Sequence, residues 1–274
     1  MGIVYRSVKY GRAVCGGLIR HGTRGRPTHP IIVPGQPQNP AQTQENAMTR
    51  ANPRPCHALL FGATGLVGTH LLQQLLASPG IARVTAATRK PLLVRDPKLN
   101  NLVSDFSRFE QREWPAAVDV AFSCLGTTLK QAGSRAAFHA VDHDLVLRCA
   151  GWAQQLGAQH FLAVSAIGIS KHSLVYYNRV KAETEQDLAA LGFLRLTLMQ
   201  PSLLLGERGG RYRPGEALAT RLAPVLGPLL AGPLSAYAPV QAADVAQAML
   251  ARALAPADAG IERLRYRDIM RLAR

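Results

Sequence analysis

Three regularly spaced glycines follow a short apolar run near residue 60, and they constrain the fold of this chain more than any other feature. The apolar run covers 59–61, and the glycines stand at positions 62, 65 and 68. Leucines at positions 71, 72, 75 and 76 then recur on one face of a helix. The pattern predicts a strand over 57–62, a tight turn, and a helix over about 65–78 whose N-terminus is aimed at a phosphate group.

Each glycine of this turn has its own physical role. Gly62 allows the sharp reversal, Gly65 leaves room for a phosphate beside the backbone, and Gly68 lets the helix pack close to the strand. The spacing G-x-x-G-x-x-G differs from the usual G-x-G-x-x-G fingerprint, so an ordinary strand-to-helix turn remains an alternative at this point. The residues of the turn expected to contact a bound dinucleotide are Gly62, Thr64, Gly65, Leu66, Val67 and Gly68.

Strand-like and helix-like segments alternate along the rest of the chain. Apolar runs predict strands over 84–88, 102–106, 118–124, 160–166 and 193–199, and amphipathic patterns predict helices over 135–157, 176–191 and 244–255. Continuously apolar strands separated by helices are typical of a parallel sheet that is covered on both faces. The predicted fold class is therefore α/β, a Rossmann-type doubly wound parallel sheet, with a small C-terminal substrate-side region over 206–274.

Residues 1–55 differ from everything after them. They are rich in Gly, Pro, Gln, Asn and Arg and have no hydrophobic periodicity. We expect this basic extension to be disordered, or to be non-native if synthesis begins at Met48. An organellar transit peptide is a third interpretation, although serine is scarce and no amphipathic helix is evident. The folded domain is accordingly expected over 56–274.

The formal net charge of +15 raises the question of a nucleic-acid partner. Eight Lys or Arg residues precede Pro55 against a single acid, which places +7 of the excess outside the expected fold. The chain shows neither a zinc-ligand spacing nor an aromatic-rich RNA-binding strand, so we expect no specific nucleic acid and no metal.

Prolines interrupt the uncharged stretch 222–243, so no membrane span is expected. Four scattered cysteines without a secretion signal predict a reduced, cytoplasmic protein.

A tyrosine and a lysine are the first candidates for chemistry. Tyr177 and Lys181 lie four residues apart in a predicted helix and therefore share one face. The lysine ammonium favours the phenolate, which lowers the pKa of the tyrosine toward a useful range.

Ser165 ends the predicted strand 160–166, and ligands of an open parallel sheet bind at the carboxyl ends of its strands. Its hydroxyl can orient a substrate carbonyl while the tyrosine transfers the proton, although alone it would equally well cap the next loop.

Together, the glycine turn, Ser165, Tyr177 and Lys181 resemble a short-chain dehydrogenase/reductase of the extended or atypical type. More closely, the chain resembles the Tat-interacting oxidoreductase-like subgroup and its bacterial NAD(P)-binding relatives, over about residues 57–255. The stretches that support this resemblance are 118–128, 141–147, 160–168 and 201–208. The resemblance implies an NAD(P)-binding domain over 56–274 and hydride transfer between the cofactor and a carbonyl or alcohol.

The resemblance also implies a role for particular residues. Tyr177 is the general acid/base, Lys181 is its pKa partner and a ribose ligand, and Ser165 orients the carbonyl. The remaining cofactor contacts run from the adenine through the centre to the nicotinamide and are Asp105, Phe106, Cys124, Leu125, Gly126 and Pro201.

Two positions depart from the family pattern. Ala166 replaces a second serine, and Gln200 stands where close relatives carry arginine. These departures keep open a non-catalytic NADPH-binding redox sensor or scaffold with a protein partner. A nucleotide-sugar epimerase ranks lower, because the region after the last predicted strand is short for a sugar-nucleotide domain.

Two cations at the end of the second predicted strand bear on the choice of cofactor. An NAD-preferring site places an acidic residue there to bind the ribose 2′-hydroxyl, whereas this chain has Arg89 and Lys90. Because both suit a 2′-phosphate, we predict NADP, with NAD as the alternative. The substrate is expected to be a small and rather apolar molecule, in a pocket that draws on Leu203, Leu204, Leu222, Leu229 and Tyr237.

Overall fold

The computed structural model describes residues 56–106, 114, 117–206, 236–256 and 258–274. The expectations for residues 1–55, and for Leu222 and Leu229 in the predicted substrate pocket, lie outside the described residues.

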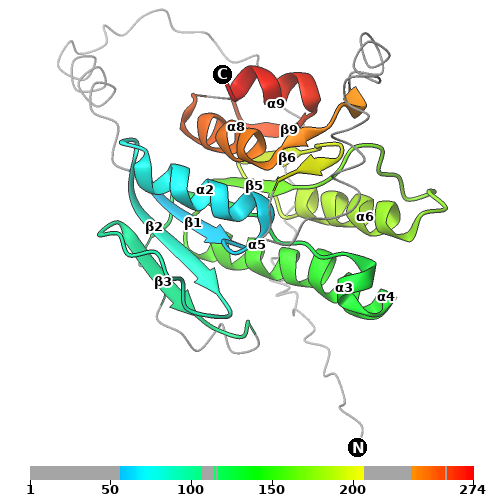
Figure 1. Ribbon diagram of the computed structural model, residues 1–274, viewed down its shortest axis with the longest axis horizontal. Helices are drawn as coiled ribbons and strands as arrows, with labels where there is room; N and C mark the ends of the chain where they lie inside the picture. Colours follow the sequence, from blue (N-terminus) through cyan, green and yellow to red (C-terminus); the bar gives the residue numbers. More distant parts are fainter. Residues whose placement is uncertain (1–55, 107–113, 115–116, 207–235, 257) are drawn as a thin grey trace, which may run out of the picture. The chain divides into compact units, whose positions relative to one another are not determined.

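Seven strands form one parallel sheet in the order β3-β2-β1-β4-β5-β6-β9 (Figure 1). The strands are β1 (Cys56–Phe61), β2 (Ile81–Thr88), β3 (Leu99–Val103), β4 (Val120–Ser123), β5 (His160–Val164), β6 (Arg195–Met199) and β9 (Gly260–Leu264). Every neighbouring pair is parallel, so all seven carboxyl ends lie at the same edge. The first six strands follow the order of a doubly wound dinucleotide-binding sheet, which confirms the predicted fold class.

Helices cover both faces of the sheet. The elements are α2 (Leu66–Ala77), α3 (Leu129–Ala132), α4 (Arg135–His139), the π-helical turn η2 (Ala140–Asp144), α5 (Leu145–Gln155), α6 (Tyr176–Ala190), α8 (Ala242–Leu254) and α9 (Tyr266–Leu272). Buried side chains of α2, α8 and α9 form one apolar cluster with the sheet, and those of α5 and α6 form another. No helix of the described residues is long and apolar enough to cross a membrane.

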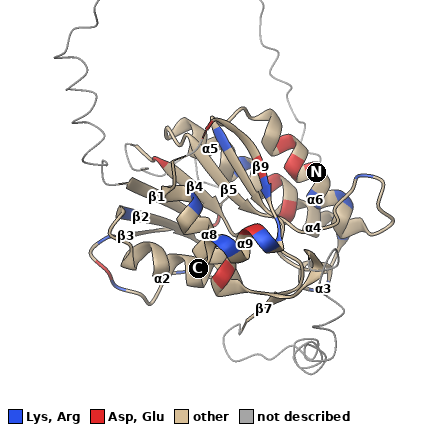
Figure 2. Cartoon of the chain, turned by 90° about the horizontal axis from the view of Figure 1, so that it is seen from above, with Lys and Arg blue, Asp and Glu red and all other residues tan. Residues whose placement is uncertain are grey.

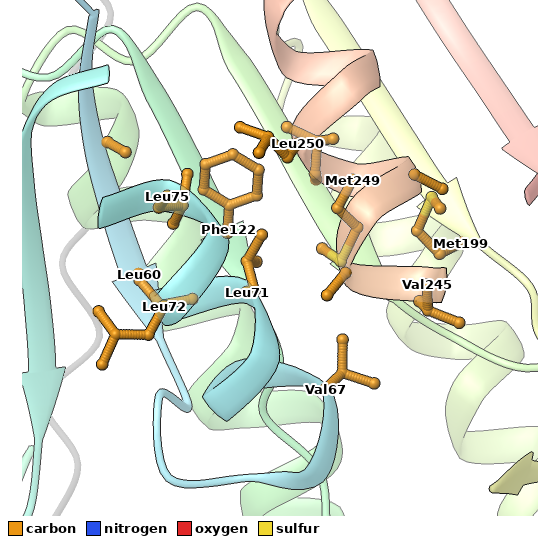
Figure 3. Close-up of a cluster of buried hydrophobic side chains, with 14 of the residues drawn as sticks. Leu60, Val67, Leu71, Leu72, Leu75, Phe122, Met199, Val245, Met249 and Leu250 are labelled. Carbon is orange, nitrogen blue, oxygen red and sulfur yellow. The ribbon is translucent and has the colours of Figure 1, made fainter. Parts of the chain in front are cut away.

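The alternation of side chains along β1 explains the two layers. Leu60 belongs to the cluster with α2 and α8, where Leu71 and Met249 lie close by (Figure 3). Leu59 and Phe61 point to the opposite face and join the cluster with α5 and α6. Because both faces are covered, every one of these side chains is buried, which is why the strand reads as a continuous apolar run.

Two features of the fold differ from the sequence-based expectations. The helix expected over 135–157 is interrupted by η2, which closes with π-helical hydrogen bonds between α4 and α5. β9 pairs with β6 although it lies in the stretch expected on the substrate side, as does α8, which packs near α2. The strand was missed because its sequence, Gly-Ile-Glu-Arg-Leu, is short and carries two charged residues, as an edge strand permits.

A second, two-stranded sheet pairs β7 (Leu204–Leu205) with β8 (Val240–Gln241). β7 is the next strand along the chain after β6, and β8 leads directly into α8. Charged side chains of both signs are interspersed along α6 and α9 (Figure 2).

Candidate functional site

The glycine turn between β1 and α2 is packed so closely that side chains are excluded from it. Gly62 has φ +79°, and a Cβ there would lie 2.6 Å from the carbonyl carbon of Cys124. A Cβ on Gly68 would lie 2.0 Å from the carbonyl oxygen of Gly62, so the first turn of α2 sits directly against the strand end. At Gly65 the nearest atom to such a Cβ would be the same oxygen, at 3.2 Å. The turn therefore leaves its backbone bare toward the carboxyl edge of the sheet.

The N-terminus of α2 begins at this turn without a cap. Its N-cap residue is Gly65, which makes no side-chain capping hydrogen bond, and its first turn contains no acidic residue. Backbone N–H groups at such a helix start lack intrahelical partners and favour an anion. The bare turn and the uncapped helix start together fit a phosphate group.

Two adjoining cavities open along the carboxyl edge of the sheet. The larger, here called the glycine-turn cavity, has a volume of about 1010 Å³ and includes the turn and the end of β2. The smaller, here called the tyrosine cavity, has a volume of about 330 Å³ and lies between the ends of β4, β5 and β6 and the start of α6. Both are lined by Leu66, Cys124, Leu125, Gly126 and Thr127. The shared residues make the two cavities one continuous groove, which suits an elongated ligand.

The groove gathers nearly all the residues singled out from the sequence. The glycine-turn cavity is lined by Gly62, Thr64, Gly65, Leu66, Arg89, Asp105, Phe106, Cys124, Leu125 and Gly126. The tyrosine cavity is lined by Leu66, Val67, Cys124, Leu125, Gly126, Ser165, Tyr177, Lys181 and Pro201. Gly68 and Lys90 line neither cavity. Gly68 packs beneath the turn, and the backbone carbonyl of Lys90 accepts a hydrogen bond from Thr88 Oγ1 at 2.7 Å.

Phe106 combines burial with an unusual backbone conformation. It has φ +64°, a region that bulky residues rarely occupy, and its side chain is buried at the wall of the glycine-turn cavity. A conformation of this kind persists only where its surroundings hold it, and it is often found at ligand sites.

Ser165 carries a hydroxyl that has no hydrogen-bond partner among the described residues. Its side chain is buried at the end of β5, and its Oγ makes no hydrogen bond within the described residues. The position of the residue is nevertheless fixed, because its backbone N–H donates to the carbonyl oxygen of Met199 at 2.7 Å. An unpaired buried hydroxyl at a cavity wall has the chemistry to bind a polar ligand atom. Ala166, also at the wall, supplies no second hydroxyl.

Lys181 is held by a buried carboxylate that the sequence did not single out. Its Nζ lies 2.8 Å from Oδ1 of Asp142, and the two side chains are 7% and 1% exposed. The other oxygen of Asp142 accepts the backbone N–H of Thr127 at 2.8 Å, and Thr184 Oγ1 donates to the Asp142 carbonyl at 3.0 Å. A Cβ on Gly126 would lie 3.3 Å from Asp142 Oδ1, so the glycine there leaves room for the ion pair.

The pKa values of the pair Tyr177 and Lys181 follow from burial and charge. Burial raises the pKa of Tyr177, and the lysine ammonium only partly opposes it, while Asp142 adds to the rise. The expectation of a lowered tyrosine pKa is therefore wrong for the protein without ligands. Burial alone would lower the pKa of Lys181, but Asp142, Tyr177 and Glu185 outweigh it, so that pKa is raised. The lysine stays charged and the phenol stays protonated.

Gln200 lies behind the cavity rather than in its wall. It is buried, and its Nε2 donates to both oxygens of Glu185 at 2.9 and 3.1 Å. Its Oε1 accepts from Nε of Arg265 at 3.2 Å, and Arg263 pairs with Glu185 at 3.0 Å. The glutamine thus ties β6 to α6 instead of contacting the ligand groove directly.

Several residues of the groove were missed by sequence reasoning. Thr69, His70, Gln73 and Arg148 line the glycine-turn cavity, and Asp142 lines the tyrosine cavity. Arg148 lies in α5, and in the sequence it cannot be told from an ordinary solvent-exposed arginine on a helix. The sequence did contain a hint of Asp142. An acidic residue beside apolar Val141 in a helix expected to be partly buried needs a partner, because a carboxylate is rarely buried without one.

Comparison with known proteins agrees with this geometry. The NAD(P)H-binding family matches residues 62–256. Protein HTATIP2 of Rattus norvegicus is 34% identical over 219 residues, which cover 78% of this chain and 88% of the relative. Protein FMP52, mitochondrial, of Eremothecium gossypii is 32% identical over 219 residues, which cover 80% of this chain and 97% of the relative.

Solved structures with the same fold are more distant. MoeE5 in complex with UDP-glucose and NAD has a TM-score of 0.57 at 15% identity, covering 79% of this chain and 80% of its own. The PhqB reductase domain of Penicillium fellutanum has a TM-score of 0.52 at 19% identity, covering 80% of this chain and 70% of its own.

The relatives also correct one expectation and settle the family. FMP52 proteins of Eremothecium gossypii, Aspergillus clavatus and Aspergillus fumigatus are named as mitochondrial, so the expectation of a cytoplasmic protein is wrong. The fold, the groove and the match over most of the chain agree on a nicotinamide-dinucleotide site. The chain belongs to the NAD(P)H-binding family, within the HTATIP2-like subgroup of atypical short-chain dehydrogenases/reductases.

Proposed function

We propose that this protein is an NADP-dependent oxidoreductase that interconverts a small carbonyl compound and its alcohol. The observation that carries the proposal is the tyrosine cavity, which is lined by a serine hydroxyl unpaired among the described residues, a protonated phenol and a charged lysine. These are the groups that carbonyl reduction requires: a hydrogen-bond donor for the oxygen, a proton donor, and a positive charge to stabilise the phenolate that remains.

The residues of the groove suit each part of the cofactor. The bare glycine turn and the uncapped start of α2 would hold the pyrophosphate. Arg89 would pair with the 2′-phosphate, and Arg148 adds a second cation to the same cavity. Lys181 would bind the ribose next to the nicotinamide, since its ammonium has three donors and Asp142 engages it from one side.

The chemistry divides between cofactor and protein. When bound, the reduced cofactor supplies a hydride to the carbonyl carbon. Ser165 Oγ donates a hydrogen bond to the carbonyl oxygen and orients it. The Tyr177 hydroxyl gives its proton to that oxygen, and its raised pKa keeps the phenol protonated at neutral pH. The charge of Lys181 stabilises the phenolate that is left until solvent returns the proton.

The substrate is proposed to be small and partly apolar. The tyrosine cavity has a volume of about 330 Å³, and Val164, Leu203 and Leu204 contribute apolar wall to it. Tyr237, expected to line the pocket, is half exposed and does not line either cavity.

Substitution of the proposed acid tests the mechanism. Tyr177→Phe should lower kcat with a carbonyl substrate by at least about 1000-fold, while the Kd for NADPH stays within about threefold. Tyr176→Phe is the matched control, because that neighbouring phenol donates to the Arg135 carbonyl and lies outside both cavities. Turnover that survives Tyr177→Phe would contradict the mechanism.

A non-catalytic NADPH-binding sensor is the second candidate, and the absence of a hydroxyl on Ala166 at the cavity wall favours it. A panel of aldehydes and ketones incubated with protein and NADPH separates the two. Tight NADPH binding without oxidation of NADPH by any carbonyl compound supports the sensor, and turnover with any of them supports the enzyme.

A further inference from the structure

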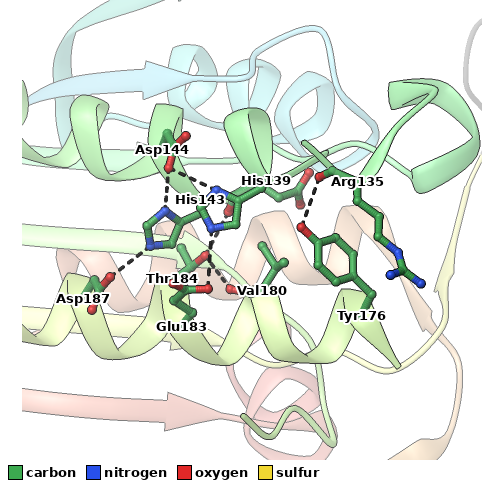
Figure 4. A network of polar contacts seen from close by, with 10 residues as sticks. Arg135, His139, His143, Asp144, Tyr176, Val180, Glu183, Thr184 and Asp187 are labelled. Carbon is green, nitrogen blue, oxygen red and sulfur yellow. Dashed lines mark hydrogen bonds and ion pairs between the residues drawn. The ribbon is translucent and has the colours of Figure 1, made fainter. Parts of the chain in front are cut away.

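Two histidines and three carboxylates meet between α6 and the segment formed by α4 and η2 (Figure 4). His139, His143 and Asp144 come from the end of α4 and from η2, whereas Glu183 and Asp187 come from α6. We call these five residues the histidine cluster. None of them lines the glycine-turn cavity or the tyrosine cavity.

The two imidazole rings share one carboxylate oxygen. Nδ1 of His139 lies 3.2 Å from Asp144 Oδ1, and Nδ1 of His143 lies 2.8 Å from the same atom. The ring centroids are 4.5 Å apart. Both rings therefore point their Nδ1 atoms at one small volume beside Asp144.

The opposite nitrogen of each ring faces a carboxylate of α6. Nε2 of His143 lies 2.9 Å from Oδ2 of Asp187, and Nε2 of His139 lies 3.5 Å from Oε2 of Glu183. In metal sites, a ligating histidine usually donates its other ring N–H to a carboxylate, which fixes the ring and its tautomer. The histidine cluster repeats this arrangement twice.

The carboxylates around the two rings call for positive charge. A neutral imidazole has a single N–H, yet both nitrogens of each ring face carboxylate oxygens. One protonated ring supplies part of that charge, because His143 then donates from both nitrogens, to Asp144 and to Asp187. A metal ion on the Nδ1 side supplies it for both rings, because each neutral ring then donates Nε2–H to its carboxylate on α6.

We propose that the histidine cluster binds a divalent transition-metal ion, with zinc as the best match, through Nδ1 of His139, Nδ1 of His143 and Oδ1 of Asp144. Zinc bonds to nitrogen and oxygen of about 2.0–2.1 Å imply ligand atoms roughly 3.3 Å apart in a tetrahedral site. One ligand atom from each of the three residues lies within 4.8 Å of the others, and the two Nδ1 atoms lie 3.2 and 2.8 Å from Asp144 Oδ1. Asp144 is half exposed, which leaves the fourth position open to water.

The site is connected to the active site through the elements that form it. The same turn η2 that carries His143 and Asp144 outward carries Asp142 inward to Lys181. On α6, Thr184 stands between Glu183 and Glu185 and donates to the carbonyl of Asp142. A bound ion would fix the two rings, whose Nε2 atoms face Asp187 and Glu183 of α6. On the other side of η2, the pair Asp142 and Lys181 joins the turn to α6 directly.

Sequence spacing carried a weak signal for this site, which was missed. His139 and His143 stand four residues apart, a spacing at which two histidines on a helix can share a zinc ion. The spacing alone is common, and the supporting carboxylates come about 40 residues later on another helix. Only the packing of η2 against α6 brings those carboxylates to the rings.

Metal binding to the full chain tests the proposal. Protein freed of metal with a chelator is titrated with ZnCl2 by calorimetry, and with CoCl2 while the visible absorption of tetrahedral Co²⁺ is recorded. We expect one ion per cluster with a Kd of about 10 μM or tighter. His139→Asn/His143→Asn should weaken binding at least 100-fold, and Asp187→Asn, which removes only the outer carboxylate charge, about tenfold.

Control variants separate this site from other histidines and from misfolding. His172→Asn replaces an exposed histidine outside the cluster, and His21→Asn/His29→Asn replaces two in the N-terminal segment, so all three changes should leave the Co²⁺ spectrum unchanged. Asp144→Asn replaces a half-exposed ligand and should keep the fold while losing the spectrum. Wild-type protein that binds no Zn²⁺ at about 100 μM, or binding that survives the loss of both cluster histidines, overturns the proposal.

Discussion

Asp142 is the single residue on which the electrostatics of the tyrosine cavity depend most. Its carboxylate pairs with Lys181 while accepting the Thr127 N–H, and both members of the pair are buried. Burial by itself would lower the pKa of the lysine, and the carboxylate reverses that effect. In the proposed mechanism Asp142 acts through Lys181, whose charge it stabilises, as a positioning residue.

Asp142→Asn keeps the shape and removes the charge. We expect the free energy of unfolding to fall by about 3 kcal/mol, because Lys181 is left as a buried charge without a counter-ion. The basic limb of the kcat/KM profile should move to lower pH, since the lysine then loses its proton earlier. Urea unfolding and a pH–rate profile measure the two effects. Asp258→Asn, at an exposed carboxylate, is the control and should change neither.

His160 gives the molecule a different pH dependence. Its Nε2 lies 2.8 Å from Thr197 Oγ1, whose proton goes to Glu262, so Nε2 carries the ring proton and Nδ1 is left unpaired within the described residues. Burial, with Arg195 nearby, lowers the pKa of His160 to about 3. Above the unfolded pKa of about 6.5 the ring is neutral in both states and has no effect. Below that value only the unfolded chain takes up the proton, so stability falls with falling pH.

The size of this effect follows from the two pKa values. Between pH 7 and pH 5, His160 should cost about 2 kcal/mol of unfolding free energy. His160→Gln keeps a donor for Thr197 and should remove that part of the pH dependence. Urea unfolding of wild type and variant at both pH values gives the difference, and His172→Gln is the exposed control. Parallel pH dependences of wild type and His160→Gln would contradict the lowered pKa.

At the scale of elements, glycine has opposite effects on the stability of α2 and α5. Gly68 lies in the first turn of α2, where a Cβ would collide with the carbonyl oxygen of Gly62 at 2.0 Å. Gly151 lies inside α5, and apart from its chain neighbours and the backbone of its own helix no described atom lies within 4 Å of the place where its Cβ would be. The first glycine is required by packing, whereas the second only weakens its helix.

The same substitution should therefore have opposite effects at these two sites. Gly68→Ala should lower the free energy of unfolding by about 3 kcal/mol and weaken NADPH binding, because α2 must move away from the turn. Gly151→Ala should raise the free energy of unfolding by about 0.5–1 kcal/mol and leave binding unchanged. Thermal and urea unfolding of both variants, with NADPH titrations, provide the comparison. Equal changes in the unfolding free energy for the two variants would mean that the packing of α2 does not depend on the close approach of Gly68 to Gly62.

How far the sequence predicts these elements depends on how each one is buried. The strand at 57–62 and the helix at 65–78 were predicted within a residue or two, because both are covered and apolar. β9 was missed because it is an edge strand with polar residues, and η2 was missed because a single π-helical turn is too short to stand out in the apolar pattern of 135–157. Ser165, Tyr177 and Lys181 were brought together as expected, but Asp142 was not, since its role comes from packing between η2 and α6.

At the scale of the whole molecule, the sheet order determines where the ligand lies. Strands β2 and β3 are added on one side of β1, and β4, β5 and β6 on the other. The groove runs across the carboxyl ends of the strands at this change of side, between β1 and β4. Ligand in this groove would contact β1, β2, β4, β5, β6 and α6 together. Its binding free energy should therefore appear as stability of the whole domain rather than of one element.

Thermal unfolding with cofactor present measures this coupling and identifies the preferred cofactor. At a hundredfold excess over its Kd, NADPH should add about 2.7 kcal/mol, which corresponds to a rise in Tm of roughly 5–10 °C for a domain of this size. NADH at the same concentration should give a smaller rise, because Arg89 then has no 2′-phosphate to pair with.

Arg89→Ser provides the decisive comparison for this prediction. The variant removes the cation at the end of β2 and should reduce the NADPH effect to that of NADH, while the NADH effect itself stays within about 1 °C. Lys90→Ser is the matched control, because Lys90 is the neighbouring exposed cation and does not line the groove. If Lys90→Ser abolished the preference and Arg89→Ser did not, the 2′-phosphate would be held by the loop after β2 instead of by the cavity wall. Equal Tm shifts for NADPH and NADH in the wild type would exclude a preference for NADP altogether.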